Sequence, residues 1–263
     1  MATTNIPEFP AASPLCTLKQ RVGLTDIEVV YSRPGAKGRK IFGALVPYDK
    51  FWRTGANMAT RIIFSTPVKL NGSEIKAGNY GFMSIPGKDE WTIIINSEPP
   101  QVGPFKYNEA ADVLRLKVKA TELHDAVNTF TIDFDDLLDE SATMNLMWDK
   151  TKVSIKIEVA FVEELASHVE KFMGSDHKEK PYFQAGLFYF NHNKDLNKAK
   201  EWVERAITER EIYPFVFVKA KIQAKLGDAN GAKSSAKHAH ELAIKANDTG
   251  FAGMIDDFSS TLN

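Results

Sequence analysis

The segment Val153-Ser154-Ile155-Lys156-Ile157-Glu158-Val159 alternates apolar and polar residues, which is the period of a β-strand with one buried face. After Glu163 the apolar residues recur instead at intervals of three and four, the spacing of an amphipathic helix. This change of period predicts an α+β chain with two domains. We expect a flexible arm over residues 1–12, an all-β domain over residues 13–163 and a helical domain over residues 164–263.

Upstream of this strand, short apolar or alternating segments recur between turn residues. Asn71-Gly72 supplies the positive φ angles of a tight hairpin, and Pro86-Gly87 marks a second one. The segments themselves lie at 27–31, 61–64, 68–70, 80–85, 91–95, 113–118 and 130–134. The pattern predicts roughly eight to ten strands in an antiparallel β-sandwich or barrel.

Downstream, the helical half contains a weak internal repeat. Ala199 and Ala206 precede Ala232 and Ala239 by 33 residues each, close to the period of tetratricopeptide repeats. We expect two such repeats and a closing helix near residues 251–260, with a generic helical bundle as the alternative. Because about three repeats are needed to bury a solenoid's own face, this tail is expected to contact the β domain or a protein partner.

The composition excludes several classes of protein. The 263 residues are 43% hydrophobic and 25% charged, which is ordinary for a globular chain. Thirty-three basic residues balance 34 acidic ones, so we expect no nucleic-acid partner. No apolar run approaches the roughly 20 residues of a membrane span. The single cysteine, Cys16, and histidines without zinc-binding spacing predict no metal and no cofactor.

Charge is nevertheless uneven near the first quarter of the chain. Nine basic residues stand against three acidic ones between Lys19 and Arg61. This segment contains a long connection over residues 33–57, and connections of that length are usually functional or disordered. Its bulky side chains argue against disorder. The candidate ligand-binding residues are Arg33, Arg39, Tyr48, Trp52, Arg53 and Asn57.

These residue types suit a small anionic or glycan-like ligand. Arginine presents a planar set of donors to carboxylate, sulfate or phosphate, and aromatic rings stack on sugars. A structural interpretation is equally physical: Arg53 would pair with a carboxylate of residues 133–140, Trp52 would fill the core, and Asn57 would cap a turn. A third interpretation is an enzyme of the hydrolase or isomerase type, in which Arg53 and Asn57 stabilise an oxyanion. No serine-nucleophile or phosphate-loop motif supports catalysis, so a binding protein is expected.

Several motifs match a known family. They are Tyr31-Ser32-Arg33-Pro34, Trp52-Arg53-Thr54-Gly55-Ala56-Asn57 and Asn145-Leu146-Met147-Trp148. With them, about 150 residues from Ser13 to Val159 resemble the bacterial family catalogued as domain of unknown function 2911. The resemblance implies an exported protein in the periplasm or cell envelope, and it supplies no activity or catalytic residues. The first twelve residues show no signal peptide, so the cytoplasm is the alternative compartment.

Overall fold

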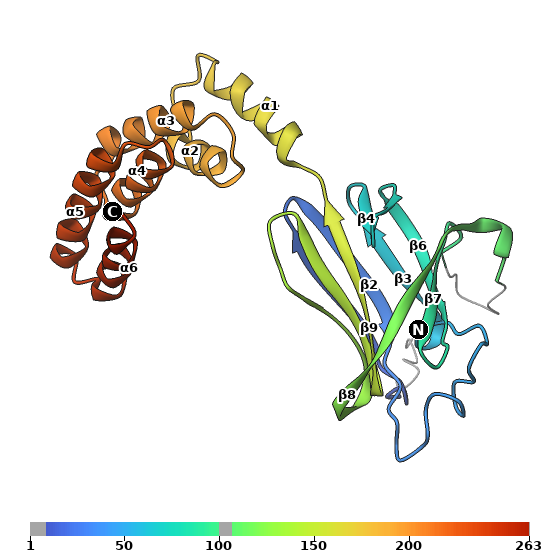
Figure 1. The fold of residues 1–263 in the computed structure, drawn as a ribbon. Coiled ribbons are helices and arrows are strands. Elements are labelled where there is room, and N and C mark those ends of the chain that lie inside the picture. The colour runs from blue at the N-terminus through green and yellow to red at the C-terminus, as the bar shows by residue number, and fades with distance from the viewer. Residues whose placement is uncertain (1–8, 100–106, 263) are drawn as a thin grey trace, which may run out of the picture. The chain divides into compact units, whose positions relative to one another are not determined.

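The computed structural model describes residues 9–99 and 107–262, which divide into two compact units between Phe161 and Val162 (Figure 1). The first unit is built of strands and the second of helices. The division falls two residues before the expected boundary at 163/164. Of the expected arm over residues 1–12, residues 1–8 lie outside the described part, and 9–12 belong to no helix or strand.

The described residues of the β unit form nine antiparallel strands and one 3-10 turn, η1 (Glu109–Ala111). The strands are β1 (Leu15–Val22), β2 (Thr25–Ser32), β3 (Ala56–Phe64), β4 (Val68–Leu70), β5 (Ser73–Ile75), β6 (Gly78–Ile85), β7 (Glu90–Asn96), β8 (Asp112–Asp135) and β9 (Ser141–Val159). Their order is β1-β2-β3-β6-β7-β8-β9-β4-β5. This architecture confirms the predicted antiparallel β domain.

The strand β8 joins two parts of this sheet. Residues 112–119 pair with β7, and residues 120–135 pair with β9. The phenol of Tyr31 on β2 accepts from Ile132 N at 2.9 Å, which shows that β2 faces the second half of β8. The sheet therefore folds back on itself, and the inward side chains of both parts form one core. Side chains such as Ile62, Ile93 and Ile155 are completely buried there.

Local sequence explains the turns but not the length of the last two strands. Asn71 and Gly72 have φ angles of 45° and 83°, as the predicted hairpin turn between β4 and β5 requires. The segments 113–118 and 130–134, expected as separate strands, both belong to β8. Register shifts between Glu122 and Thr131 let the strand bend without ending. Period-two alternation alone does not reveal such a continuous strand.

Residues 162–262 of the helical unit form six helices. They are α1 (Val162–Met173), α2 (Tyr182–Asn191), α3 (Leu196–Glu209), α4 (Tyr213–Lys225), α5 (Ala229–Lys245) and α6 (Thr249–Ser260). Consecutive helices α2 to α6 pack against one another, and α2 also contacts α4 (Figure 1). The helical C-terminal domain is thus confirmed, including a last helix over the expected residues.

Aspartate residues begin three of these helices. Asp195 accepts from the backbone of Asn197 and Lys198, Asp228 from Gly231, and Asp248 from Phe251. Four small residues permit close helix packing, because they are at most 5% exposed: Ala199, Ala206, Ala232 and Ala239. Within residues 9–99 and 107–262, every helix is too short or too polar to span a bilayer.

Candidate functional site

The connection between β2 and β3 is fixed to the sheet at both of its ends. Near its start, Ala36 N donates to Asn128 O at 2.7 Å, so the connection begins alongside β8. Near its end, Trp52 and Ser84 exchange two main-chain hydrogen bonds of 2.8 and 3.0 Å, which attach it to β6. The connection is therefore an ordered part of the domain.

Its apolar residues enter the main core. Ile41, Phe42 and Val46 are no more than 6% exposed. Trp52 is half-buried, and its indole N–H donates to Gly55 O at 3.0 Å. The Trp52 ring centroid lies 5.1–6.1 Å from those of Phe42, Trp91, Phe130 and Trp148. This geometry gives Trp52 a packing role in the aromatic part of the core.

Two of the predicted arginines donate to the protein's own oxygens. Arg33 Nε donates to Phe130 O at 3.1 Å, and its Nη2 donates to Thr131 Oγ1 at 2.7 Å. Arg39 Nε and Nη2 donate to Ala36 O and Gly35 O at 3.0 and 2.7 Å. Both guanidinium groups thereby brace the connection, which leaves fewer donors for a ligand.

The turn over residues 52–57 brings three predicted residues together. Thr54 is fully buried with φ 53°, a conformation that β-branched residues rarely adopt, and its hydroxyl lies 2.8 Å from Ser84 Oγ. Asn57 Nδ2 donates to Ser13 O at 3.0 Å and Ser32 Oγ at 3.2 Å. Arg53 is exposed, and its Nη1 donates to Asn57 O. The Asn57 amide donors that an oxyanion would need are thus engaged.

Four of the six predicted residues are exposed, and two of them, Tyr48 and Arg53, keep a ring face or donors that the protein itself does not use. Tyr48 is 38% exposed and lies against Gly43, where an added Cβ would meet its ring at 2.6 Å. Arg53 forms no ion pair with any carboxylate of the described residues, including those of the acidic run 133–140. In that run Asp133 instead accepts from Asn145, and Asp136 accepts from Thr143. The described residues contain no group of three or more side chains arranged to hold a metal ion.

A polar cluster at the start of β8 was not anticipated from the sequence. Asp112 accepts from Tyr107 at 2.6 Å, Arg115 at 2.7 Å and Asn96 at 2.8 Å. Burial and the hydrogen bond to Asp112 raise the pKa of Tyr107 to about 12. Burial alone would raise the pKa of Asp112, but its hydrogen bonds outweigh that effect and lower it. Both carboxylate oxygens are occupied, so the cluster is a structural brace.

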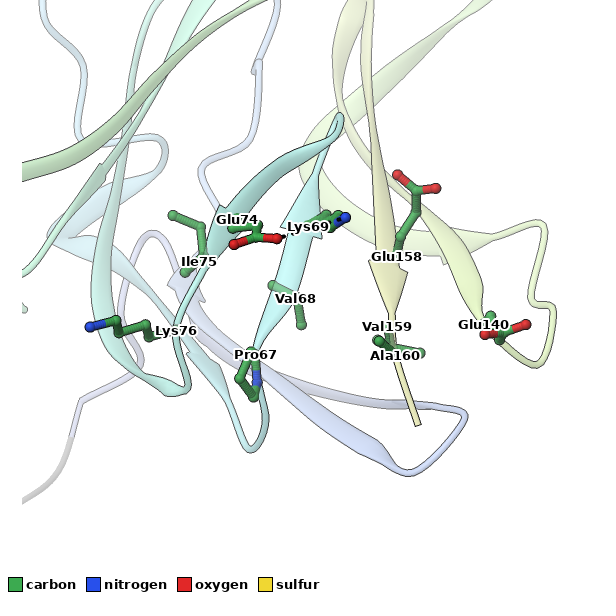
Figure 2. A pocket seen from close by; sticks show the side chains of 10 residues that line it. All are labelled: Pro67, Val68, Lys69, Glu74, Ile75, Lys76, Glu140, Glu158, Val159 and Ala160. Atoms are coloured by element: carbon green, nitrogen blue, oxygen red, sulfur yellow. Dashed lines mark ion pairs between the residues drawn. The ribbon is translucent and has the colours of Figure 1, made fainter. Parts of the chain in front are cut away.

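A cavity of about 670 Å³ lies beside the start of β4 and the ends of β5 and β9, and Figure 2 shows its lining. Its floor contains Val68, which pairs in register with Ile75 on one side and Val159 on the other. Two lysines and three glutamates line the cavity, and Lys69 Nζ lies 3.8 Å from Glu74 Oε1. None of the six predicted residues lines this cavity. Because neither charge dominates, its chemistry selects no ligand class.

The helix α4 presents a second cationic surface, formed by Lys221 and Lys225. Lys221 Nζ lies 4.4 Å from the centroid of the Phe217 ring, and Lys225 Nζ lies 5.2 Å from that of Phe190. Lys225 also donates to Asn193 Oδ1. Neither lysine forms an ion pair within the described chain.

Neighbouring lysines differ from these two. Lys198 pairs with Glu170 at 2.7 Å, and Lys219 pairs with Glu204 at 3.0 Å. From the sequence alone, all of these lysines are assigned to one solvent-exposed face of the helical domain. One sequence feature does indicate the cationic surface: Phe217, Lys221 and Lys225 follow one another at intervals of four residues, about one helical turn.

Comparison with known proteins places part of the chain in a described family. Residues 13–157 match a family described as Protein of unknown function (DUF2911). No curated protein and no solved structure matches the chain.

Proposed function

The chain belongs to the DUF2911 family of proteins of unknown function, and we propose that it is a binding protein whose helical unit holds an acidic segment of a partner protein. The observation that carries this proposal is the pair Lys221 and Lys225. Both are cations held over aromatic rings, and no carboxylate of the described residues neutralises them. A partner's aspartate or glutamate side chains would supply the missing charge.

The arrangement of the helices supports a protein ligand. The helix-capping residues Asp195 and Asp228 stand 33 residues apart, and each begins the second helix of a hairpin, α2–α3 or α4–α5, as in tetratricopeptide-like units. Phe217 also packs against Phe251 and Phe258 of α6, with centroids 5.5 and 5.4 Å away. The two cations therefore stand on a rigid, ring-lined helix. The proposal includes an envelope location, which the family resemblance implies.

The test is binding of a fluorescein-labelled oligoglutamate peptide, followed by fluorescence polarisation. We expect the full chain to bind this peptide. The double variant Lys221→Gln with Lys225→Gln is expected to bind it more weakly, with a dissociation constant about tenfold higher. The expected loss of affinity is smaller than the full strength of two charge-assisted hydrogen bonds, because solvent screens exposed charges.

The matched control removes the same charge elsewhere. Lys233 and Lys237 on α5 have the same spacing and are exposed, so the double variant Lys233→Gln with Lys237→Gln is expected to bind like the wild type. Equal weakening in both double variants would indicate non-specific attraction. An oligoglutamate peptide that does not bind the wild type would exclude an acidic partner at α4.

A second candidate is a small anionic or glycan-like ligand at the connection between β2 and β3. The observation in its favour is the exposed Arg53, which uses one donor on Asn57 O and has no carboxylate partner among the described residues. The exposed ring of Tyr48 would supply a stacking face. Arg33, Arg39, Trp52 and Asn57 would then support the site rather than touch the ligand.

Thermal unfolding in the presence of phosphate and of a sulfated sugar tests this second candidate. We expect either anion to raise the melting temperature of the wild type and to leave that of Arg53→Ala unchanged, because the guanidinium is the anchoring group. Lys50→Ala, which removes another exposed cation of the same connection, is the control and should respond like the wild type. An equal shift in all three proteins, or none, would assign the connection to bracing alone.

A further inference from the structure

The strand β1 is a long, regular edge of the sheet. All eight of its residues pair with β2 without a register shift, and β1 is the first strand in the sheet order. The opposite edge, β5, has only three residues. Natural edge strands are usually shortened, bulged, interrupted by proline or charged, and of these features β1 shows only the charges of Lys19 and Arg21.

Half of the backbone groups of β1 point away from β2. The two-residue turn Gly23-Leu24 makes Val22 and Thr25 a hydrogen-bonded pair, so alternate residues back along β1 bond to β2. The bond from Arg33 N to Pro14 O at 2.9 Å agrees with this alternation, because Pro14 is two residues before Cys16 and also bonds towards the β2 side. The outward groups consequently belong to Leu15, Thr17, Lys19 and Arg21.

These outward groups have almost no partners. No backbone group in residues 9–99 or 107–262 pairs with them. A single side chain reaches them, since Gln20 Nε2 donates to Arg21 O at 2.8 Å. Lys19 and Arg21 are 73% and 64% exposed, so the edge is open to solvent.

We propose that this edge pairs with the β1 strand of a second copy of the chain, antiparallel, about a two-fold axis at Leu18. In that register Leu15 lies opposite Arg21 of the second copy, and Thr17 lies opposite Lys19 of the second copy. Each of these residues then exchanges its outward N–H and C=O with its opposite, and the Arg21 carbonyl, which also accepts from Gln20 Nε2, uses its second lone pair for this bond. The strand is self-complementary, as a two-fold interface requires.

The charges of β1 are compatible with this register. About the axis at Leu18, both cations lie opposite uncharged residues. A slip of the axis by two residues, to Gln20, would place Lys19 opposite Arg21 of the second copy, and like charges directly opposite are destabilising. Within each copy the ion pairs Lys19–Glu28 and Arg21–Asp26, at 3.0 and 3.3 Å, reduce the remaining repulsion. The cations therefore permit this pairing and oppose those in which the axis moves towards Arg21.

The inward side chains are also suited to pairing. Cys16 and Leu18 are half-buried and pack against the main core at its open edge. At the two-fold axis Leu18 meets Leu18 of the second copy, which completes the burial of both. Cys16 meets Gln20 of the second copy, so the native cysteines do not face each other.

Analytical ultracentrifugation of the full chain tests the proposal. We expect a reversible equilibrium between one and two copies at micromolar to millimolar protein. Thr17→Pro removes one outward N–H and no bond to β2, so it should give a folded monomer, whereas Thr17→Ala should still dimerise. A wild type that stays monomeric overturns the proposal and leaves the edge to a strand of another protein. A Thr17→Pro protein that dimerises as the wild type does also overturns it.

Cross-linking tests the register even if Thr17→Pro fails to fold. Residues facing each other at a non-hydrogen-bonded pair have Cα atoms about 4.5 Å apart, within the range of a disulfide. We expect the double variant Cys16→Ser with Leu18→Cys to form a disulfide-linked dimer with oxidised glutathione, and the wild type to form none. A dimer cross-linked through native Cys16, or no cross-link in the double variant, overturns the axis at Leu18.

Discussion

Replacing Trp52 by alanine is expected to lower the free energy of unfolding of the β unit by about 3–5 kcal/mol. The Trp52 indole contacts four other core rings and hydrogen-bonds to Gly55 O, so the variant loses both packing and the bond that closes the turn. Differential scanning calorimetry of the full chain, with its transitions assigned to the two units, measures the change. The transition of the helical unit should stay where it is.

Tyr48→Ala is the matched control for this experiment. Tyr48 belongs to the same connection, but it is 38% exposed and rests on a glycine, so its loss should cost about 1 kcal/mol or less. A Trp52→Ala protein that unfolds like the wild type would contradict the packing role. Trp52 would then again be a candidate for stacking on a ligand.

The contrast between these two residues shows what the sequence predicts and what it does not. Alternation of period two and the Asn71-Gly72 turn specify local backbone geometry, so the strands and the hairpin could be predicted. The residues 33–57 do not alternate, because Ile41, Phe42 and Val46 enter the core singly rather than as one face of a strand. Periodicity therefore gives no sign that this connection is part of the core.

The excess of basic residues in the same connection does not predict which of them are free to bind a ligand, for an electrostatic reason. Counting charges finds acidic partners for arginine, but Arg33 and Arg39 donate to Phe130 O, Thr131 Oγ1, Gly35 O and Ala36 O. Backbone carbonyls and hydroxyls carry no formal charge, so an excess of basic residues in the sequence does not mean an excess of free donors. The pairing of Lys198 and Lys219 with glutamates of other helices is equally invisible before folding, and so are the ring contacts that distinguish Lys221 and Lys225.

Gly186→Ala is expected to destabilise the helical unit by about 1–3 kcal/mol, against the ordinary preference of helices for alanine. Gly186 lies inside α2 where α3 crosses it, and an added Cβ would stand 2.6 Å from Val203 Cγ2 and 2.9 Å from Ala199 O. One of these atoms belongs to the backbone of α3, so relief requires the two helices to move apart.

Gly253 inside α6 is the matched control, because nothing lies within 4 Å of its added Cβ. There the same substitution should stabilise the unit by about 0.5–1 kcal/mol, which is the propensity difference alone. Thermal unfolding followed by far-UV circular dichroism compares the two variants, and changes of the same sign would show that α2 and α3 do not pack as closely as Gly186 permits.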